Sequence, residues 1–365
     1  MAEPCTGGAD IVELSPFDPW INNQIGGTGP LVDPQALATW QLAALRRTIA
    51  HARDHSPFYR TRLAGLPTDS PRCPDDLLAV PTTKPDELTD DPLRFLCVSQ
   101  DEVARMVTVR TSGTTGAPKR LAFDEADLAA TLDCFRVTMT TLSKAGDTVL
   151  VLFPAQVPDS VGDLILRCLP LYGARGVAGD PSGDPGKLAA ELTRHKPDCL
   201  IAAPSQLALS KDDPAVARAA RACLRTMVFA SDYLPRHWKG EIRARFGCPV
   251  FDYYSATEMG YGGGMECAAD CGYHLREADH YFEVLDLSSD TPVPPGELGE
   301  VVFTTLSRRA MPLVRYRTGD AARMLPGPCP CGSRLRRLGP ILGRIERHNG
   351  AVRIMQPPKG KTDRP

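Results

Sequence analysis

The chain has 365 residues, enough to bury a sizeable core and to form about two domains, or one large domain with an appendage. Charged residues make up 24% of the chain and the formal net charge is -2, so neither a broad nucleic-acid surface nor an acidic-membrane surface is expected. No stretch approaches the roughly 18 uninterrupted apolar residues of a membrane span. The start, Met1–Cys5, lacks the basic and apolar regions of a signal peptide, so we expect a cytoplasmic protein with small, nearly neutral partners.

The first two segments differ in their apolar patterning. Residues 1–34 are rich in Gly, Pro and Asp without a sustained period, which predicts a loosely packed arm. From Pro34 onward apolar residues recur at helical spacing, and Pro57 closes the segment. This pattern predicts an amphipathic helix carrying Leu37, Trp40, Leu42, Leu45, Ile49 and Ala50.

Residues 35–280 have the pattern of an α/β core. Short apolar runs alternate there with helical stretches, which is typical of a mostly parallel sheet covered by helices. The predicted strands are Val107–Val109, Thr148–Phe153, Cys199–Ala202, Thr226–Phe229 and Val250–Tyr254.

The remainder of the chain is rich in strands and turns. Residues 281–343 predict an antiparallel subdomain, with strands at Tyr281–Leu285, Gly299–Thr304 and Pro312–Tyr316. Residues 344–365 are too few to form a further domain, and the polar stretch Gln356–Pro365 predicts a disordered tail.

A polar loop follows the predicted strand Val107–Val109. Glycines let backbone N–H groups approach a phosphate closely, hydroxyls add donors, and a lysine adds positive charge. The spacing differs from that of the P-loop in nucleoside triphosphatases, and an ordinary surface loop is the alternative. The candidate phosphate-binding residues are Ser112, Gly113, Thr114, Thr115, Gly116 and Lys119.

The string Thr111–Lys119, Thr-Ser-Gly-Thr-Thr-Gly-Ala-Pro-Lys, resembles the phosphate loop of the adenylate-forming superfamily. That superfamily comprises acyl-CoA synthetases, peptide-synthetase adenylation domains and luciferases. Two further strings follow in the family's order: Tyr253–Glu258 resembles its aromatic-x-x-Thr-Glu motif, and Tyr316–Asp320 its Tyr-Arg-Thr-Gly-Asp motif. The resemblance implies ATP-dependent activation of a carboxylic acid as its acyl-adenylate.

The resemblance also assigns roles to residues. It implies that the loop hydroxyls and Lys119 hold the β- and γ-phosphates and that Thr257 contacts the α-phosphate. Glu258 would ligate Mg²⁺, a hard ion that prefers oxygen, and Asp320 would accept hydrogen bonds from the ribose. Taken alone, Asp320 would be a turn residue and Glu258 a solvated helix start. The remaining nucleotide-binding candidates implied are Ala230, Ser231, Asp232, Tyr254, Ser255 and Arg344.

Four other strings point to one branch of the superfamily. Ser56–Arg60, Val80–Lys84, Val301–Leu306 and Pro312–Tyr316 resemble phenylacetate-CoA ligases, and the likeness runs from about residue 35 to about residue 347. That branch forms aryl- or acyl-CoA thioesters by adenylation and then thiolysis, so coenzyme A is the implied second substrate.

The family's small C-terminal domain should begin near Arg344, at a hinge where Glu346 replaces the usual Asp, and this chain ends about twenty residues later. Three alternatives follow. The core alone or a partner protein completes the ligase; the acyl group passes to a carrier-protein thiol or an amine; or the chain is a nucleotide-binding relative that no longer turns over and acts with a partner.

Cysteines near the end of the chain form a second constellation. Thiolates and an imidazole suit a tetrahedral structural zinc, and Cys-x-Cys-Gly supplies a tight knuckle. Some phenylacetate-CoA ligase relatives have similar spacing, so we expect Zn²⁺ bound by Cys267, His274, Cys329 and Cys331, with Cys271 competing for one place. The alternative is a set of reduced cysteines within a β-rich subdomain.

The resemblance places the acyl pocket between the helix that follows the phosphate loop and the segment 153–163. That segment lacks the aromatic-rich sequence of phenylacetate enzymes and contains Asp159 and Asp163. Such an acid could pair with an amino group on the substrate, or it could serve a turn or a helix cap. An aryl or small acyl acid is the expected substrate class.

Overall fold

The structure is a computed structural model that describes residues 14–109, 118–348 and 351–355. Its α-helices are α1 (Phe17–Gln24), α2 (Pro34–His55), α3 (Pro57–Arg62), α4 (Pro85–Asp90), α5 (Glu125–Thr140), α6 (Val161–Cys168), α7 (Pro185–His195), α8 (Pro204–Leu207), α9 (Pro214–Cys223) and α10 (Arg236–Phe246). Short 3-10 helices are η1 (Pro74–Ala79), η2 (Pro92–Phe95), η3 (Gln100–Glu102), η4 (Leu169–Tyr172) and η5 (Thr257–Met259).

The strands run through most of the described chain. They are β1 (Arg105–Val109), β2 (Lys119–Phe123), β3 (Thr148–Val151), β4 (Arg175–Ala178), β5 (Cys199–Ala202), β6 (Thr226–Ala230), β7 (Val250–Tyr254), β8 (Gly264–Glu266), β9 (Tyr273–Leu275), β10 (His280–Leu285), β11 (Leu298–Thr305), β12 (Tyr316–Leu325), β13 (Arg337–Leu338), β14 (Gly343–His348) and β15 (Ala351–Met355).

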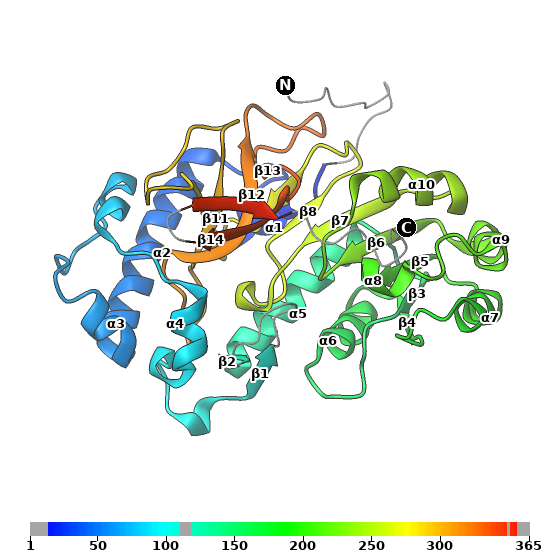
Figure 1. Ribbon diagram of the computed structural model, residues 1–365, viewed down its shortest axis with the longest axis horizontal. Coiled ribbons are helices and arrows are strands. Elements are labelled where there is room, and N and C mark those ends of the chain that lie inside the picture. The colour runs from blue at the N-terminus through cyan, green and yellow to red at the C-terminus, as the bar shows by residue number, and fades with distance from the viewer. Residues whose placement is uncertain (1–13, 110–117, 349–350, 356–365) are drawn as a thin grey trace.

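Within the described residues, 13 of these strands form one mixed sheet. Its main path has the order β10-β11-β12-β13-β9-β8-β7-β6-β5-β3-β4, and β14 and β15 branch from β12. The pairs from β4 to β7 are parallel, and α6 to α10 accompany this part of the sheet (Figure 1). The pairs from β7 to β10 are antiparallel. The expected α/β fold with a parallel-rich sheet and a later antiparallel region is confirmed, but the predicted strand Val107–Val109 belongs to a separate antiparallel ribbon with β2 and not to this sheet.

The parallel strands are buried on both faces. Val149 and Val151 of β3 belong to the large core that includes side chains of α5 and α6. Leu150 and Leu152 belong to a second core that includes side chains of α7, α9 and α10. Because helices cover both faces, the strands read as continuous apolar runs rather than alternating ones, which is why the sequence located them well.

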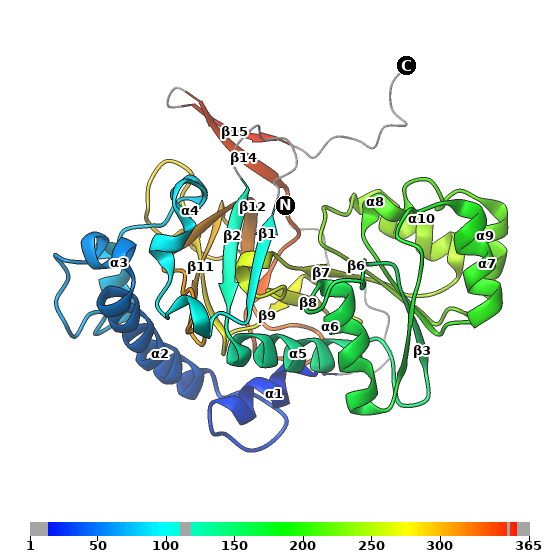
Figure 2. The same cartoon turned by 90° about the horizontal axis from the view of Figure 1, so that it is seen from below.

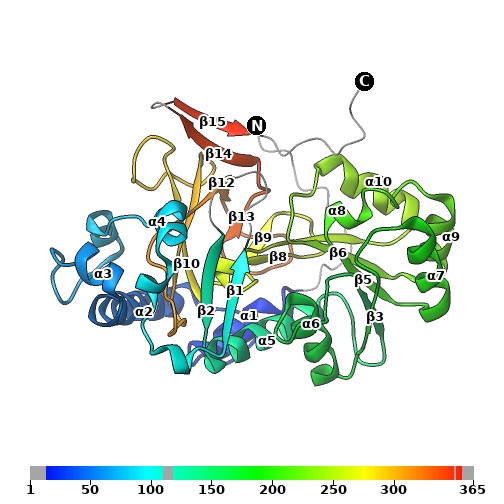
Figure 3. The same cartoon turned by 60° about the horizontal axis from the view of Figure 1, so that its bottom comes forward.

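The ribbon β1–β2 and helix α5 form one continuous unit beside this sheet (Figure 3). β2 begins at Lys119, and α5 begins at Glu125 directly after a capping box. In that box Asp127 N donates to Asp124 Oδ1 (2.8 Å) and Asp124 N donates to Asp127 Oδ2 (3.2 Å). Reciprocal capping fixes where the helix starts, so the position of Lys119 is coupled to that of the helix.

The N-terminal segment is better packed than its composition indicated. Residues 1–13 lie outside the described residues, but α1 buries Phe17 and Ile21 in the core. The indole Nε1 of Trp20 also donates to Asp133 Oδ2 of α5 (2.7 Å). The prediction of a loose arm is therefore wrong for this helix, because its apolar anchors are too few to produce a periodic signal.

The segment after Gly343 also differs from the expectation. β14 pairs with β12, placing Arg344 opposite Asp320, and then pairs with β15 in a hairpin that projects from the body (Figure 2). The predicted tail Gln356–Pro365 lies outside the described residues. Of the helices that the structure describes, none combines the length and apolar character that a membrane span requires.

Arg315 is a buried cation at the junction between the N-terminal helices and the sheet. Its guanidinium is fully buried, pairs with Glu283 (3.0 Å), and donates to the carbonyls of Leu77 and Val80 (2.9 and 2.7 Å). The residue adopts φ 44°. This turn explains why the predicted strand Pro312–Tyr316 is wrong and β12 begins only at Tyr316.

Replacing Arg315 by Ala should lower the free energy of unfolding by roughly 3–5 kcal/mol, because Glu283 would be left buried without its partner. Urea unfolding measures this change. Arg323→Ala is the matched control, since Arg323 is exposed on the same strand, and it should change stability by less than about 0.5 kcal/mol. Equal losses of unfolding free energy in both variants would contradict a stabilising role of the buried Arg315–Glu283 pair.

Candidate active site

Three distant segments meet at one buried ion pair. Lys119 is the first residue of β2, Glu258 lies in η5 directly after β7, and Tyr316 is the first residue of β12. Lys119 Nζ donates to Glu258 Oε1 (2.9 Å) and to the Tyr316 hydroxyl (3.0 Å). The same hydroxyl donates to Glu258 Oε1 (3.1 Å). The arrangement joins all three motifs that the sequence singled out, with Lys119 as the last residue of the first.

The charges of this cluster balance. Lys119, Glu258 and Tyr316 are 7%, 9% and 2% exposed. Burial raises the pKa of Glu258, but the positive charge of Lys119 and the hydrogen bonds from Lys119 and Tyr316 outweigh it, so the pKa lies below its ordinary value. Burial and the Glu258 charge raise the pKa of Tyr316. Near pH 7 Glu258 is therefore an anion that accepts both hydrogen bonds, and Tyr316 is a neutral donor.

Arg308 contacts the backbone of the segment that carries Glu258. The sequence did not predict this contact. Arg308 Nη1 donates to the Glu258 carbonyl (3.1 Å), and its guanidinium lies 4.5 Å from the centre of the Phe123 ring. Nothing in the local sequence Ser307–Arg309 distinguishes it from a surface arginine. Only the fold, which brings residues 258 and 308 together, reveals this contact.

Asp320 forms a second polar centre nearby. Tyr254, the last residue of β7, donates its hydroxyl to Asp320 Oδ2 (2.9 Å), and Arg344 Nη1 donates to Asp320 Oδ1. Gly319 adopts φ 77° just before the aspartate, a conformation that costs glycine little. The predicted residues Tyr254, Asp320 and Arg344 therefore lie together, on strands β7, β12 and β14.

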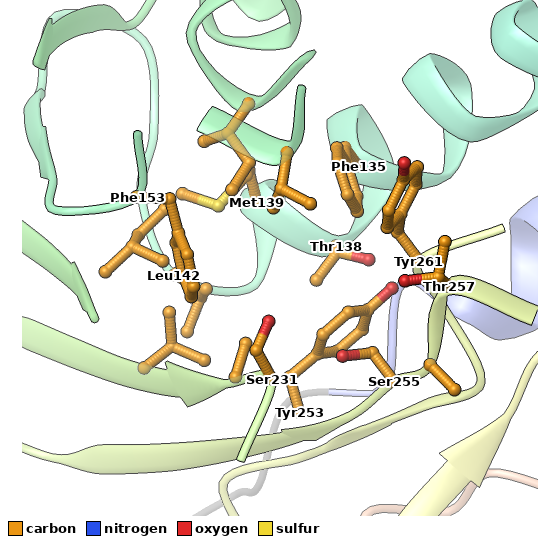
Figure 4. A pocket seen from close by; sticks show the side chains of 16 residues that line it. Phe135, Thr138, Met139, Leu142, Phe153, Ser231, Tyr253, Ser255, Thr257 and Tyr261 are labelled. Atoms are coloured by element: carbon orange, nitrogen blue, oxygen red, sulfur yellow. The ribbon is translucent and has the colours of Figure 1, made fainter. Parts of the chain in front are cut away.

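A cavity of about 160 Å³ opens beside these groups, at the carboxyl ends of β6 and β7 (Figure 4). Ligands of open α/β sheets commonly bind at this edge. Helix α5 with the residues just after it, and the segment after β3, supply many of its apolar side chains, in the region that the sequence indicated. These include Phe135, Met139, Leu142, Phe153 and Val161.

Several predicted residues border the same cavity. Ala230 ends β6 and Ser231 follows it, and Ser255 and Thr257 follow β7. Asp232 is exposed and accepts a hydrogen bond from the backbone N of Tyr233 (2.8 Å). The predicted loop residues Ser112, Gly113, Thr114, Thr115 and Gly116 lie outside the described residues.

The two aspartates considered for the pocket do not border it. Asp159 and Asp163 both pair with Arg167 of α6, at 2.6 and 3.3 Å. Asp163 Oδ2 also accepts from the backbone N of Asp159 (2.9 Å), as a turn residue does. The alternative in which they recognise a substrate amino group is therefore not supported, and the cavity lining contains neither acidic nor basic residues among those described.

The predicted zinc ligands form a separate buried cluster. The ligand atoms of Cys267, His274, Cys329 and Cys331 all lie within 4.8 Å of one another. Cys267 Sγ lies 3.6 Å from Cys329 Sγ, and Cys331 Sγ lies 3.5 Å from His274 Nε2. Two sulfurs bound to one tetrahedral zinc lie about 3.8 Å apart, so the donors fit this metal. Cys271 is not part of the set of four.

Comparisons with known proteins identify the family of the chain. The profile of the family described as "AMP-binding enzyme" matches residues 78–307. The chain is 32% identical over 342 residues to phenylacetate-coenzyme A ligase of Pseudomonas putida, covering 87% of this chain and 74% of that one. It is 31% identical over 335 residues to phenylacetate-coenzyme A ligase of Escherichia coli (strain K12), covering 87% and 73%.

A solved structure gives the same fold. The chain matches an open conformation of 2-hydroxyisobutyryl-CoA ligase, in complex with 2-HIB-AMP and CoA, with a TM-score of 0.74 and 23% identity. The match covers 88% of this chain and 78% of that one. Fold and site together define an enzyme that forms adenylates. The chain belongs to the AMP-binding enzyme family, and within it to the phenylacetate-CoA ligase-like AMP-forming acid–thiol ligases.

Replacing Lys119 by Met should destabilise the chain in a pH-dependent way. In the wild type the lowered Glu258 pKa stabilises the fold above the ordinary carboxyl pKa, and this contribution is lost as pH falls. In the variant, burial acts unopposed and raises that pKa, so ionisation at higher pH costs stability. The deficit should grow from about pH 4 to about pH 8, reaching roughly 3 kcal/mol.

Urea unfolding of both proteins at several pH values measures this deficit. Lys119→Met combined with Glu258→Gln should remove the pH dependence, because the buried carboxyl is gone. Lys187→Met is the control, since Lys187 makes only a surface pair with Asp180. A deficit of the Lys119 variant that stays constant with pH would contradict the proposed balance of charges.

Proposed function

We propose that this ligase activates a single-ring aromatic carboxylic acid with ATP and transfers the acyl group to coenzyme A. The cavity beside Thr257 carries the proposal, since it is mostly apolar, uncharged along its described lining and adjacent to the Glu258 cluster. An uncharged wall disfavours a second carboxylate or a protonated amine, because a buried charge without a partner is costly.

The size of the cavity supports one aromatic ring. Its volume is about 160 Å³, and an engineered apolar cavity of about 150 Å³ in another protein binds benzene. Phe135 and Phe153 offer aromatic surfaces for such a ring. A long aliphatic chain or a fused ring system exceeds this space.

The polar residues have roles that match their positions. Glu258 would hold Mg²⁺, which neutralises phosphate charge and prefers oxygen ligands. Lys119 would then leave Glu258 and move to the phosphates, and Thr257, at the cavity edge, would contact the α-phosphate. Asp320 would accept from the ribose hydroxyls, and Arg344 beside it would lie near the ribose. The lysine and the hydroxyls thus act by positioning and charge stabilisation.

The reaction would proceed in two displacements. First, a carboxylate oxygen of the acid attacks the α-phosphorus, the bond to the β-phosphate oxygen breaks, and pyrophosphate leaves. Next, the thiolate sulfur of coenzyme A attacks the acyl carbon, the bond to the AMP oxygen breaks, and AMP leaves. The thiol proton passes to solvent. Coenzyme A is preferred to a carrier protein or an amine because the relatives at about 30% identity are coenzyme A ligases.

We further propose that the Cys/His cluster binds one structural zinc ion. Four protein ligands leave no open coordination position, so the metal would stabilise rather than react. Cys267 directly follows β8, and His274 lies on β9. Cys329 and Cys331 lie between β12 and β13. Zinc would therefore tie these strands together beside β7, which carries Tyr254.

The cytoplasmic location expected from the sequence stays a prediction.

ATP–pyrophosphate exchange tests the proposed activity. Single-ring acids of the benzoate and phenylacetate type should support Mg²⁺-dependent exchange, whereas a long-chain fatty acid should not, because it exceeds the cavity. Lys119→Ala should reduce exchange at least about 100-fold, since it removes a charge that stabilises the transition state. The control variant Lys187→Ala, which replaces an exposed lysine, should leave the exchange rate unchanged. Exchange that is equal with fatty and aromatic acids would refute the substrate class.

Metal analysis tests the zinc proposal. The purified chain should contain one zinc ion, and Cys329→Ser should lose it and lower Tm by roughly 5–10 °C, because metal binding contributes folding free energy. Cys73→Ser is the control, since Cys73 is exposed, and it should keep both zinc and Tm. A metal-free wild type, or a Cys329 variant that melts like the control, would contradict the proposal.

A further inference from the structure

The floor of the acyl cavity contains hydroxyl groups with incomplete hydrogen bonding. Thr138 comes from α5 and Tyr253 from β7, and they are 5% and 7% exposed. In Figure 4 the Thr138 oxygen is directed toward the Tyr253 hydroxyl. Burial keeps the pKa of Tyr253 well above its ordinary value, so this phenol is a neutral donor. Both side chains line the cavity that would receive the acid.

Thr138 lacks the bond that a helical threonine ordinarily makes. In α5 Thr131 Oγ1 donates to the Asp127 carbonyl four residues earlier (3.0 Å), and Ser143 beyond the helix donates likewise to Met139 (3.2 Å). Thr138 Oγ1 is buried and has no hydrogen-bond partner among the described residues. Leaving a buried hydroxyl unpaired costs about 1–3 kcal/mol, so a partner supplied by a ligand would be favourable.

The hydroxyl of Tyr253 also has incomplete hydrogen bonding. Its hydroxyl has a weak contact with the thiol of Cys134, at 3.7 Å, and the side chain of Thr138 lies beside it. Gly262 leaves the space that the Tyr253 hydroxyl occupies, because a Cβ on that glycine would lie 2.3 Å from the phenol oxygen. A larger residue at position 262 would displace the tyrosine. The hydroxyl is thus held at a defined point without a strong partner.

We infer that the acid carries a neutral hydrogen-bonding substituent on its ring, a phenolic hydroxyl or an aromatic amine, which Thr138 and Tyr253 recognise. The inference rests on the proposed activation of a single-ring acid and narrows its substrate class. Both substituents are uncharged near neutral pH, in keeping with a lining without acidic or basic residues. Two hydroxyls can together donate to and accept from either substituent.

Recognition of this kind gives strong discrimination. A site built around a substrate hydroxyl rejects the analogue that lacks it, because its own polar groups then stay unpaired, whereas an apolar pocket discriminates weakly. The unsubstituted acid should therefore be a poorer substrate than the matching substituted isomer. If water fills the floor instead, the two acids will be used equally well.

The test compares kcat/KM in ATP–pyrophosphate exchange for benzoate, phenylacetate and their 2-, 3- and 4-hydroxy and amino derivatives. At least one substituted isomer should exceed its parent by about 10-fold or more. The hydroxy and amino arms distinguish the two substituents. A wild-type enzyme that uses every parent acid as well as its derivatives would overturn the inference while leaving the proposed aromatic acid ligase intact.

Variants tie the preference to the two side chains. Thr138→Val and Tyr253→Phe should each reduce the ratio of substituted to parent kcat/KM by about 5-fold or more. Thr141→Val is the matched control, because Thr141 Oγ1 is also buried and unpartnered among the described residues but Thr141 does not line the cavity. That control should retain the ratio.

Two other outcomes would count against the inference in different ways. A preference that survives in both Thr138→Val and Tyr253→Phe would overturn it, because some other group would then recognise the substituent. Exchange with no acid of the panel would overturn the proposed function itself and the inference with it. Binding of the preferred acid, measured by calorimetry on each variant, checks that the variants remain folded and binding-competent.

Discussion

The hydrogen-bonded ion pair between Lys119 and Glu258 is the interaction on which the active site depends. It joins the start of β2 to the loop after β7, and Tyr316 adds the start of β12. A buried charge without its partner is costly. The folded structure must therefore hold all three segments in contact. The same pair leaves Glu258 ionised. The magnesium site proposed for Glu258 therefore needs an exchange of partners rather than the creation of new charges.

The sheet explains how such distant segments meet. The parallel strands β5, β6 and β7 end at one edge, where the cavity opens, and antiparallel strands continue the sheet toward β12. Tyr253 and Tyr254 are adjacent on β7, and successive side chains of a strand point to opposite faces. Tyr253 therefore lines the acyl cavity while Tyr254 contacts Asp320. One strand thus connects the cavity, where we propose that the acid binds, to Asp320, which we propose contacts the nucleotide.

The sequence predicted the parts that local pattern determines. Strands such as Cys199–Ala202 were found because burial on both faces makes them apolar throughout, and four proposed zinc donors do lie together. Contacts between distant residues left no local signal, which is why Arg308 behind Glu258 and Trp20 against α5 were missed. The failed strand before Tyr316 has a different cause, since its apolar residues lead into a turn that packs Arg315 into the core.

The central claim is that Glu258 exchanges Lys119 for magnesium when the nucleotide binds. Calorimetric titration of ATP with and without Mg²⁺, in the wild type and in Glu258→Gln, tests it most directly. The account predicts that Mg²⁺ strengthens ATP binding to the wild type by about 10-fold or more, roughly 1.4 kcal/mol, and that this gain disappears in the variant. An equal gain from Mg²⁺ in both proteins would contradict the claim, because the metal would then be held without Glu258.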